Sequence, residues 1–233
     1  MPLRKWIKSA NHAIEGLLHA AKTQRHVRYH LYAVVLIVIA SFIVGIEWSE
    51  FIVIIILSVI VISVEMLNSV IEAISDVLFP EYHEKAKEIK DMAAGAVLIT
   101  AMGAAVIGYI ILFEPVKDFF YHGLHVAKHA KSDIAVVALI VVLVMVVILK
   151  AIFDRGEPLR GGMPSGHSAV AFSIWMAVTL TTESFMPSAL VFVMAILIAQ
   201  SRVYVGIHKA TEVLAGALLG VSITFLLFKL FAS

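Results

Sequence analysis

The chain has 233 residues, of which 61% are hydrophobic, and its mean hydropathy of +0.97 excludes an ordinary soluble domain. Its net charge of +1 leaves no surplus of Lys and Arg for contacts along a phosphate backbone, which argues against a nucleic-acid partner. Because the chain has no cysteine, disulfides, thiolate nucleophiles and thiolate metal sites are excluded.

The first predicted element is an amphipathic surface helix over residues 3–23, where apolar residues recur at spacings of three and four. Apolar runs then predict about seven membrane-spanning helices, at 31–46, 51–78, 93–113, 133–150, 166–181, 187–205 and 211–231. The expected fold class is an all-α integral membrane protein with two helical bundles. The polar stretch 114–132 predicts an interfacial linker between a domain at 1–113 with three spans and a domain at 133–233 with four.

The second predicted span carries a polar stripe. Four side chains at spacings of three, four and four project from one helical face: Glu65, Asn68, Glu72 and Asp76. Carboxylates in an apolar helix are costly unless they are paired, solvated or bound to cations. Lys90 and Asp91 follow at the start of the next span. This combination suits a divalent metal ion that carries nucleotide phosphates.

The segments EMLNSVIEAISD at 65–76 and EYHEKAKEIKDMAAGAV at 81–97 resemble the small prokaryotic diacylglycerol kinase and undecaprenol kinase family over residues 1–113. The resemblance implies Glu65 as general base and Glu72 as a metal ligand. It also implies that Asn68, the polar neighbour of the base, lies in a nucleotide site with Lys90 and Asp91. The expected cofactor is Mg²⁺ with ATP, and the expected assembly is a homotrimer with shared active sites.

One position departs from the family pattern. Where the family usually has a metal-binding Glu near the end of the surface helix, this chain offers Gln24. A neutral amide binds a hard cation more weakly than a carboxylate does. Two interpretations therefore stay open, an active lipid kinase and a retained trimerisation scaffold whose polar stripe packs between helices.

The C-terminal half carries three polar clusters at predicted helix ends: Lys150 to Pro158, Pro164-Ser165-Gly166-His167, and Ser201-Arg202 followed by His208 and Glu212. A phosphate ester needs cations, hydrogen-bond donors, a nucleophile and an acid for the leaving alkoxide. Four residues supply positive charge: Lys150, Arg155, Arg160 and Arg202. Ser165 and the Gly166 N–H supply donors, and two histidines, His167 and His208, share the acid and nucleophile roles. Glu212 lies four residues after His208, where a carboxylate orients the imidazole.

The PSGH sequence at 164–167 and the SR-x5-H sequence at 201–208 resemble the second and third motifs of the type 2 phosphatidic acid phosphatase superfamily, over about 133–231. The resemblance implies that His208 is a nucleophile forming a phosphohistidine and that His167 protonates the leaving group. It implies phosphate binding by Lys150, Arg202, Ser165 and Gly166, with no metal cofactor. The candidate substrates are phosphatidate, phosphatidylglycerol phosphate and undecaprenyl phosphates.

Two positions depart from this pattern. Glu212 stands where the family usually has Asp, and Glu157-Pro158 stands where the first motif usually has Arg-Pro, so Arg155 or Arg160 is expected to replace the missing guanidinium. A structural alternative treats the clusters as a helix start and interfacial anchors. A further, non-enzymatic alternative treats the whole chain as a membrane assembly module without turnover.

Topology follows from the basic residues, because cytoplasmic loops concentrate Lys and Arg. With the N-terminus inside, most of the 18 Lys and Arg residues fall on the inner side. The expected location is a bacterial inner membrane, crossed several times, with the kinase-like and phosphatase-like sites both on the cytoplasmic face. Three glycines of the third span, Gly95, Gly103 and Gly108, are interpreted as positions of close helix packing.

Overall fold

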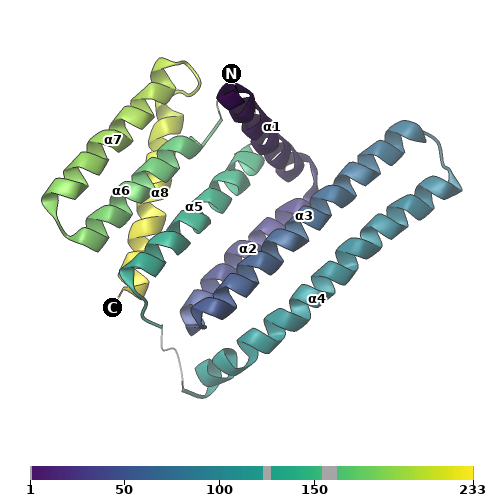
Figure 1. Ribbon diagram of the computed structural model, residues 1–233, viewed down its shortest axis with the longest axis horizontal. Helices are drawn as coiled ribbons and strands as arrows, with labels where there is room; N and C mark the ends of the chain where they lie inside the picture. Colours follow the sequence, from purple (N-terminus) through teal and green to yellow (C-terminus); the bar gives the residue numbers. More distant parts are fainter. Residues whose placement is uncertain (1, 123–126, 154–161, 233) are drawn as a thin grey trace. The chain divides into compact units, whose positions relative to one another are not determined.

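The computed structural model describes residues 2–122, 127–153 and 162–232, and of residues 2–8, 10 and 122 it describes the backbone alone. The described residues form eight α-helices and no strand (Figure 1). The helices are α1 (Pro2–Thr23), α2 (Arg25–Val44), α3 (Trp48–Leu78), α4 (Glu84–His122), α5 (Lys131–Phe153), α6 (Gly166–Thr182), α7 (Phe185–Tyr204) and α8 (Ala210–Phe231). The prediction of an all-α protein is confirmed.

Six helices within the described ranges are long and apolar enough to cross a membrane: α2, α3, α4, α5, α7 and α8. The remaining predicted span, 166–181, coincides with α6, which has 17 residues. A helix of that length reaches only about 26 Å at 1.5 Å per residue, less than the roughly 30 Å of a bilayer core. Six of the predicted spans are thus helices of full spanning length, the seventh is a helix at the short end of the range that crosses a bilayer, and the multi-pass membrane protein is confirmed.

The chain divides into two compact units, one formed by residues 1–23 with 126–233 and the other by residues 24–125. We call them the C-terminal unit and the middle unit. The division differs from the predicted domains at the N-terminus, because the first helix joins the C-terminal unit. Helix α4 also continues through Pro115 to His122, so the first part of the predicted 114–132 linker is helical.

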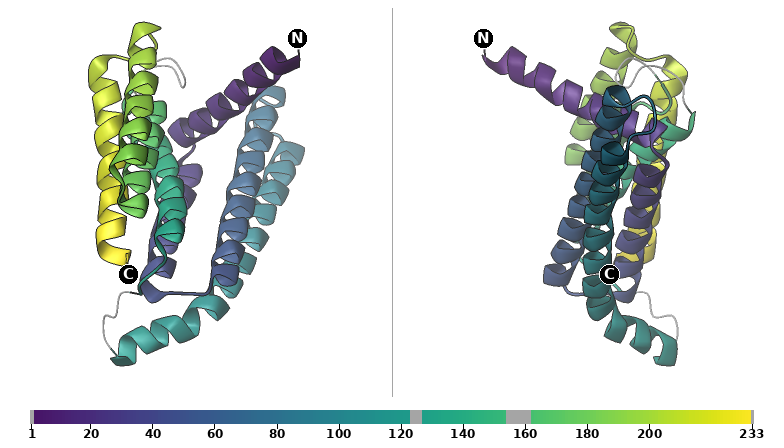
Figure 2. Two further views of the ribbon diagram at one scale, coloured as in Figure 1. Left: turned by 60° about the vertical axis from the view of Figure 1, so that its left-hand side comes forward. Right: turned by 90° about the vertical axis from the view of Figure 1, so that its right-hand side faces the viewer.

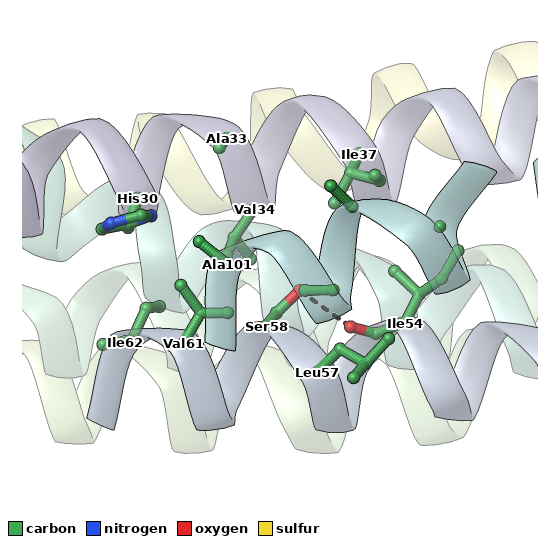
Figure 3. A pocket seen from close by; sticks show the side chains of 13 residues that line it. His30, Ala33, Val34, Ile37, Ile54, Leu57, Ser58, Val61, Ile62 and Ala101 are labelled. Atoms are coloured by element: carbon green, nitrogen blue, oxygen red, sulfur yellow. Dashed lines mark hydrogen bonds between the residues drawn. The ribbon is translucent and has the colours of Figure 1, made fainter. Parts of the chain in front are cut away.

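The middle unit consists of α2, α3 and α4, and α3 contacts both of the others. A pocket of about 200 Å³ lies among the three helices (Figure 3). Its lining is apolar except for His30 of α2 and Ser58 of α3. The Ser58 hydroxyl is already used, since it donates a hydrogen bond to the Ile54 carbonyl at 2.8 Å. The pocket therefore suits a hydrocarbon chain better than a polar group.

In the C-terminal unit, α6 contacts α5, α7 and α8, and α1 contacts α5. The α5–α8 helices lie side by side in Figures 1 and 2. Val142 and Val146 of α5 pack with Ala169 of α6, and Leu219 and Ile223 of α8 cover them. Because short turns join α6 to α7 and α7 to α8, the end of α7 and the beginnings of α6 and α8 lie at one end of the unit. The end of α5 lies there too, and this end carries the polar clusters.

Candidate active site

Polar side chains that are far apart in the sequence meet at this end of the C-terminal unit. Lys150 lies in the last turn of α5, and Arg202 lies in the last turn of α7. Ser165 is the N-cap residue of α6, while His208 lies two residues before α8. The charges of Arg202, His208 and Lys150 all act on the ring of His167 in the first turn of α6. The structure thus places these four cationic or ionisable groups close enough to interact electrostatically.

His208 is the most enclosed of these groups, with 6% of its surface exposed. Its Nδ1 lies 2.8 Å from Oε2 of Glu212. A carboxylate accepts hydrogen bonds, so Nδ1 carries the proton and Nε2 of the neutral ring keeps its lone pair. The Glu212 carboxylate also accepts hydrogen bonds from the Lys209 N–H, at 3.3 Å, and from the backbone of Gly162. A fixed carboxylate therefore holds His208 in the tautomer that a nucleophile requires.

Two groups at the start of α6 are suited to phosphate oxygens. The Ser165 side chain is completely buried, and its hydroxyl makes no hydrogen bond with any described residue. A buried hydroxyl without a partner is destabilising by about 1–3 kcal/mol, which a bound anion would relieve. The Gly166 N–H belongs to the first turn of α6, where backbone donors lack partners within the helix and the helix dipole favours negative charge.

Helix α8 holds the start of α6 in place through close contacts. Three hydrogen bonds join the two helices: the Ser165 N–H to the Glu212 carbonyl at 2.9 Å, the Ser168 hydroxyl to the Val213 carbonyl at 2.8 Å, and the Ser173 and Thr224 hydroxyls to each other at 2.8 Å. The first of them links the backbone of the predicted phosphate donor directly to the backbone of the residue that orients His208. The geometry of the site therefore depends on how α6 and α8 pack.

Two glycines of α8 make this packing possible. A Cβ atom added to Gly216 would lie 2.3 Å from the Ser165 carbonyl oxygen, and one added to Gly220 would lie 2.1 Å from that of Ala169. Sequence reasoning missed both residues, although Gly216-x-x-x-Gly220 is visible as a small-residue motif of membrane helices. It pointed instead to Gly95, Gly103 and Gly108, where an added Cβ would meet nothing within 4 Å. The interpretation of these three glycines as positions of close helix packing is therefore wrong for packing within one chain.

Two predicted phosphate ligands, Arg155 and Arg160, lie outside the described residues. The guanidinium of Arg202 is described, and its Nε donates a hydrogen bond to the Ser201 hydroxyl at 3.2 Å. The loop after it is closed by backbone hydrogen bonds from Ile207 and His208 to the Arg202 carbonyl, at 3.2 and 3.1 Å. These bonds fix the spacing between the cation and the predicted nucleophile.

The polar stripe of α3 in the middle unit is partly paired within itself. Glu65 and Asn68 are buried, and the Asn68 amide donates to the Glu72 carboxylate at 2.9 Å. The Asn68 carbonyl oxygen is buried and makes no hydrogen bond with the described residues. Lys90 of α4 donates to the Asp76 carboxylate. Solvent-exposed ion pairs of this kind contribute about 1 kcal/mol at most, so a nucleotide phosphate would compete easily for the ammonium group.

The predicted metal ligands of this stripe form no protein-only cage. Gln24 is the N-cap residue of α2 and makes no side-chain capping bond. Among the described residues, no three His, Asp or Glu side chains are close enough to hold a metal ion. Mg²⁺ is commonly bound by one or two carboxylates together with substrate phosphates. The single carboxylate of Glu72 therefore fits an ion that arrives with a nucleotide.

Comparisons with known proteins separate the two halves of the chain. Residues 11–112 match the family model of prokaryotic diacylglycerol kinase, and residues 154–233 match that of the PAP2 superfamily. No solved structure gives a significant match.

Individual relatives agree with this division. Over 109 residues the chain is 35% identical to an undecaprenol kinase of Bacillus subtilis, covering 47% of this chain and 89% of that protein. It is 34% identical to a diacylglycerol kinase of Escherichia coli over 108 residues, which are 46% of this chain and 88% of that protein. It is also 39% identical to an undecaprenyl-diphosphatase of Sulfolobus acidocaldarius over 70 residues, which are 30% of this chain and only 34% of that protein.

Proposed function

We propose that this chain, which belongs to the prokaryotic diacylglycerol kinase family through residues 11–112 and matches the PAP2 superfamily over residues 154–233, is a membrane lipid phosphatase fused to a kinase-like part. It hydrolyses a lipid phosphomonoester or pyrophosphate through a phosphohistidine. The observation that carries this proposal is the buried His208–Glu212 pair, which keeps Nε2 of His208 available beside a cluster of cations.

The chemistry proceeds in two balanced steps. Nε2 of His208 forms a bond to phosphorus while the bond from phosphorus to the leaving oxygen breaks, and His167 gives that oxygen a proton. Water then attacks the phosphohistidine, the phosphorus–nitrogen bond breaks, and His167 takes the proton of the water. Lys150, Arg202, the Ser165 hydroxyl and the Gly166 N–H neutralise the phosphoryl oxygens throughout. For a phosphomonoester the leaving group is a lipid alcohol, and for a pyrophosphate it is a lipid phosphate.

Phosphate release from detergent-solubilised protein tests this mechanism. We expect the wild type to release phosphate from phosphatidate, phosphatidylglycerol phosphate or undecaprenyl phosphates at the same rate with and without EDTA. The physical reason is that protein cations and a histidine supply every role that a metal ion would supply. Loss of activity on chelation, restored by added Mg²⁺, would contradict the metal-independent mechanism.

A second activity, ATP-dependent phosphorylation of diacylglycerol or undecaprenol, is favoured by two features of the middle unit. Glu65 is buried on α3, and the apolar pocket reaches Val61 and Ile62, one helical turn before it. A lipid chain in the pocket would leave its hydroxyl near the Glu65 carboxylate, the proposed general base. Mg²⁺ with ATP, held by Glu72 and Gln24 beside Asn68, Lys90 and Asp91, would supply charge neutralisation of the transferred phosphate. Assembly as a homotrimer through this part of the chain belongs to the same proposal.

Transfer of labelled phosphate from MgATP to these lipid alcohols separates an active kinase from a scaffold. If the site is active, we expect transfer by the wild type and its loss in Glu65→Ala, because the base is removed. Gln24→Glu should then raise the rate at low Mg²⁺, since it restores a carboxylate ligand. A wild type without transfer that gains it in Gln24→Glu indicates a degenerate scaffold.

We further propose that both sites face the cytoplasm of a bacterial inner membrane, which agrees with the basic loop at 79–92 and with the need for ATP. The chain has no cysteine, so single cysteines can report sidedness. Thr182 lies at the end of α6, and Val205, which is exposed, lies in the turn between α7 and α8. A membrane-impermeant maleimide added to intact cells should label Thr182→Cys and spare Val205→Cys. The reverse pattern would show that the phosphatase site faces outward.

A further inference from the structure

The last turn of α1 carries a lysine toward the candidate phosphatase site. Helix α1 contacts α5 within the C-terminal unit, and Figure 2 shows its C-terminal end beside that helix. Leu18 and Ala21 are 3% and 0% exposed, so this end of α1 is packed and not loosely attached. Lys22, the next residue, is partly buried in the last turn. Its position is therefore set by the packing of its neighbours.

Lys22 adds to a group of positive charges that the site already holds. The Glu212 carboxylate and, more weakly, the Lys22 ammonium act on Lys150 of α5, and Lys150 in turn acts on His167. Glu212 offsets part of the repulsion between the two ammonium groups, and a bound anion that both can approach would offset more of it. The C-terminal end of a helix also favours a cation, which is a purely structural reason for a lysine here. This preference of a helix end explains why a lysine occupies position 22. It does not explain why α1 packs against the helix that carries Lys150.

We propose that Lys22 binds the inner phosphate of a lipid diphosphate while Lys150, Arg202 and the start of α6 bind the outer one. This inference rests on the proposed phosphatase function and names its preferred substrate class. In the reaction, Nε2 of His208 bonds to the outer phosphorus, and the bond to the bridging oxygen breaks. The inner phosphate leaves on the lipid with a proton from His167. Lys22 stabilises the negative charge that a diphosphate has in excess of a monophosphate.

The test compares two lipids that share one chain, farnesyl diphosphate and farnesyl phosphate, with detergent-solubilised full-length protein. In Lys22→Met, kcat/KM for the diphosphate should fall about tenfold or more, as loss of a charge-assisted contact predicts. For the monophosphate it should stay within about twofold of wild type, because that substrate lacks the inner phosphate. Lys22→Arg should restore most of the diphosphate activity. Lys229→Met is the matched control, since Lys229 is exposed in the last turn of α8, at the far end of that helix from the site.

Two results would overturn the proposal. The first is an equal fall in kcat/KM for both lipids in Lys22→Met. It would mean that the lysine supports the packing of α1 or only adds to the overall positive potential of the site. The second is an unchanged kcat/KM for the diphosphate in Lys22→Met. If the wild type hydrolyses neither of these lipids, nor phosphatidate, phosphatidylglycerol phosphate or undecaprenyl phosphates, the phosphatase function itself is wrong. Equilibrium binding of the two farnesyl lipids to the His208→Ala protein then decides on Lys22. Tighter binding of the diphosphate that Lys22→Met abolishes would support the proposal, and equal binding of the two lipids would reject it.

Discussion

Replacing His208 by alanine is expected to lower the rate of lipid phosphate hydrolysis by at least about 10³-fold, because the reaction then has no group that can take the phosphoryl. The imidazole of His208 is buried and held by Glu212 at 2.8 Å, whereas the His12–Glu15 pair of α1, at 3.2 Å, is exposed. Phosphate release is measured under substrate saturation and again at low substrate. The loss should appear in both kcat and kcat/KM, because the missing bond forms only during the chemical step.

A matched histidine elsewhere separates catalysis from general damage. His83, between α3 and α4, is exposed and lies in the other unit, so His83→Ala should keep wild-type phosphatase activity. Size-exclusion chromatography in detergent should give the same elution for wild type and both variants. Retention of more than about a tenth of the activity in a folded His208→Ala protein would remove His208 from the role of nucleophile.

The positions of the site residues along the chain were predictable because they follow the span pattern. Lys150, His167 and Arg202 lie at ends of predicted spans, and successive helices that reverse direction return to the same side. This argument needs only where apolar runs begin and end. The roles of these residues in catalysis remain predictions.

The packing inside the site was not predictable in the same way. Membrane helices are apolar around most of their circumference, so periodicity does not tell which face meets which neighbour. The burial of Ser165 and the contact of Gly216 with its carbonyl oxygen depend on that choice. The amphipathic pattern of the first helix likewise indicated an apolar face but not the helix against which that face packs. In the structure, Leu18 and Ala21 of this face are buried in the C-terminal unit.

Replacing Gly216 by alanine is expected to change the stability of the protein strongly. The sign of this change is opposite to that of the same substitution at an ordinary helix glycine. Alanine is a better helix former than glycine by about 1 kcal/mol, so a Gly→Ala change in open space should stabilise a helix. Gly103 and Gly95 of α4 have such open space and provide the matched controls. At Gly216 the new methyl carbon would lie 2.3 Å from a backbone oxygen that cannot rotate away. Helix α6 must then move away from α8.

We therefore expect Gly216→Ala to destabilise the protein by about 1–3 kcal/mol, the usual range for overpacking a core. The move also stretches the hydrogen bond from the Ser165 N–H to the Glu212 carbonyl, so the phosphate donor shifts relative to His208. A displacement of about 1 Å at a catalytic site lowers rates about 10²-fold. Thermal unfolding in detergent and phosphate release at a temperature where both proteins are folded measure the two effects separately. If Gly216→Ala matched Gly103→Ala in stability and retained full activity, the close approach of α6 to α8 would not be what positions the site.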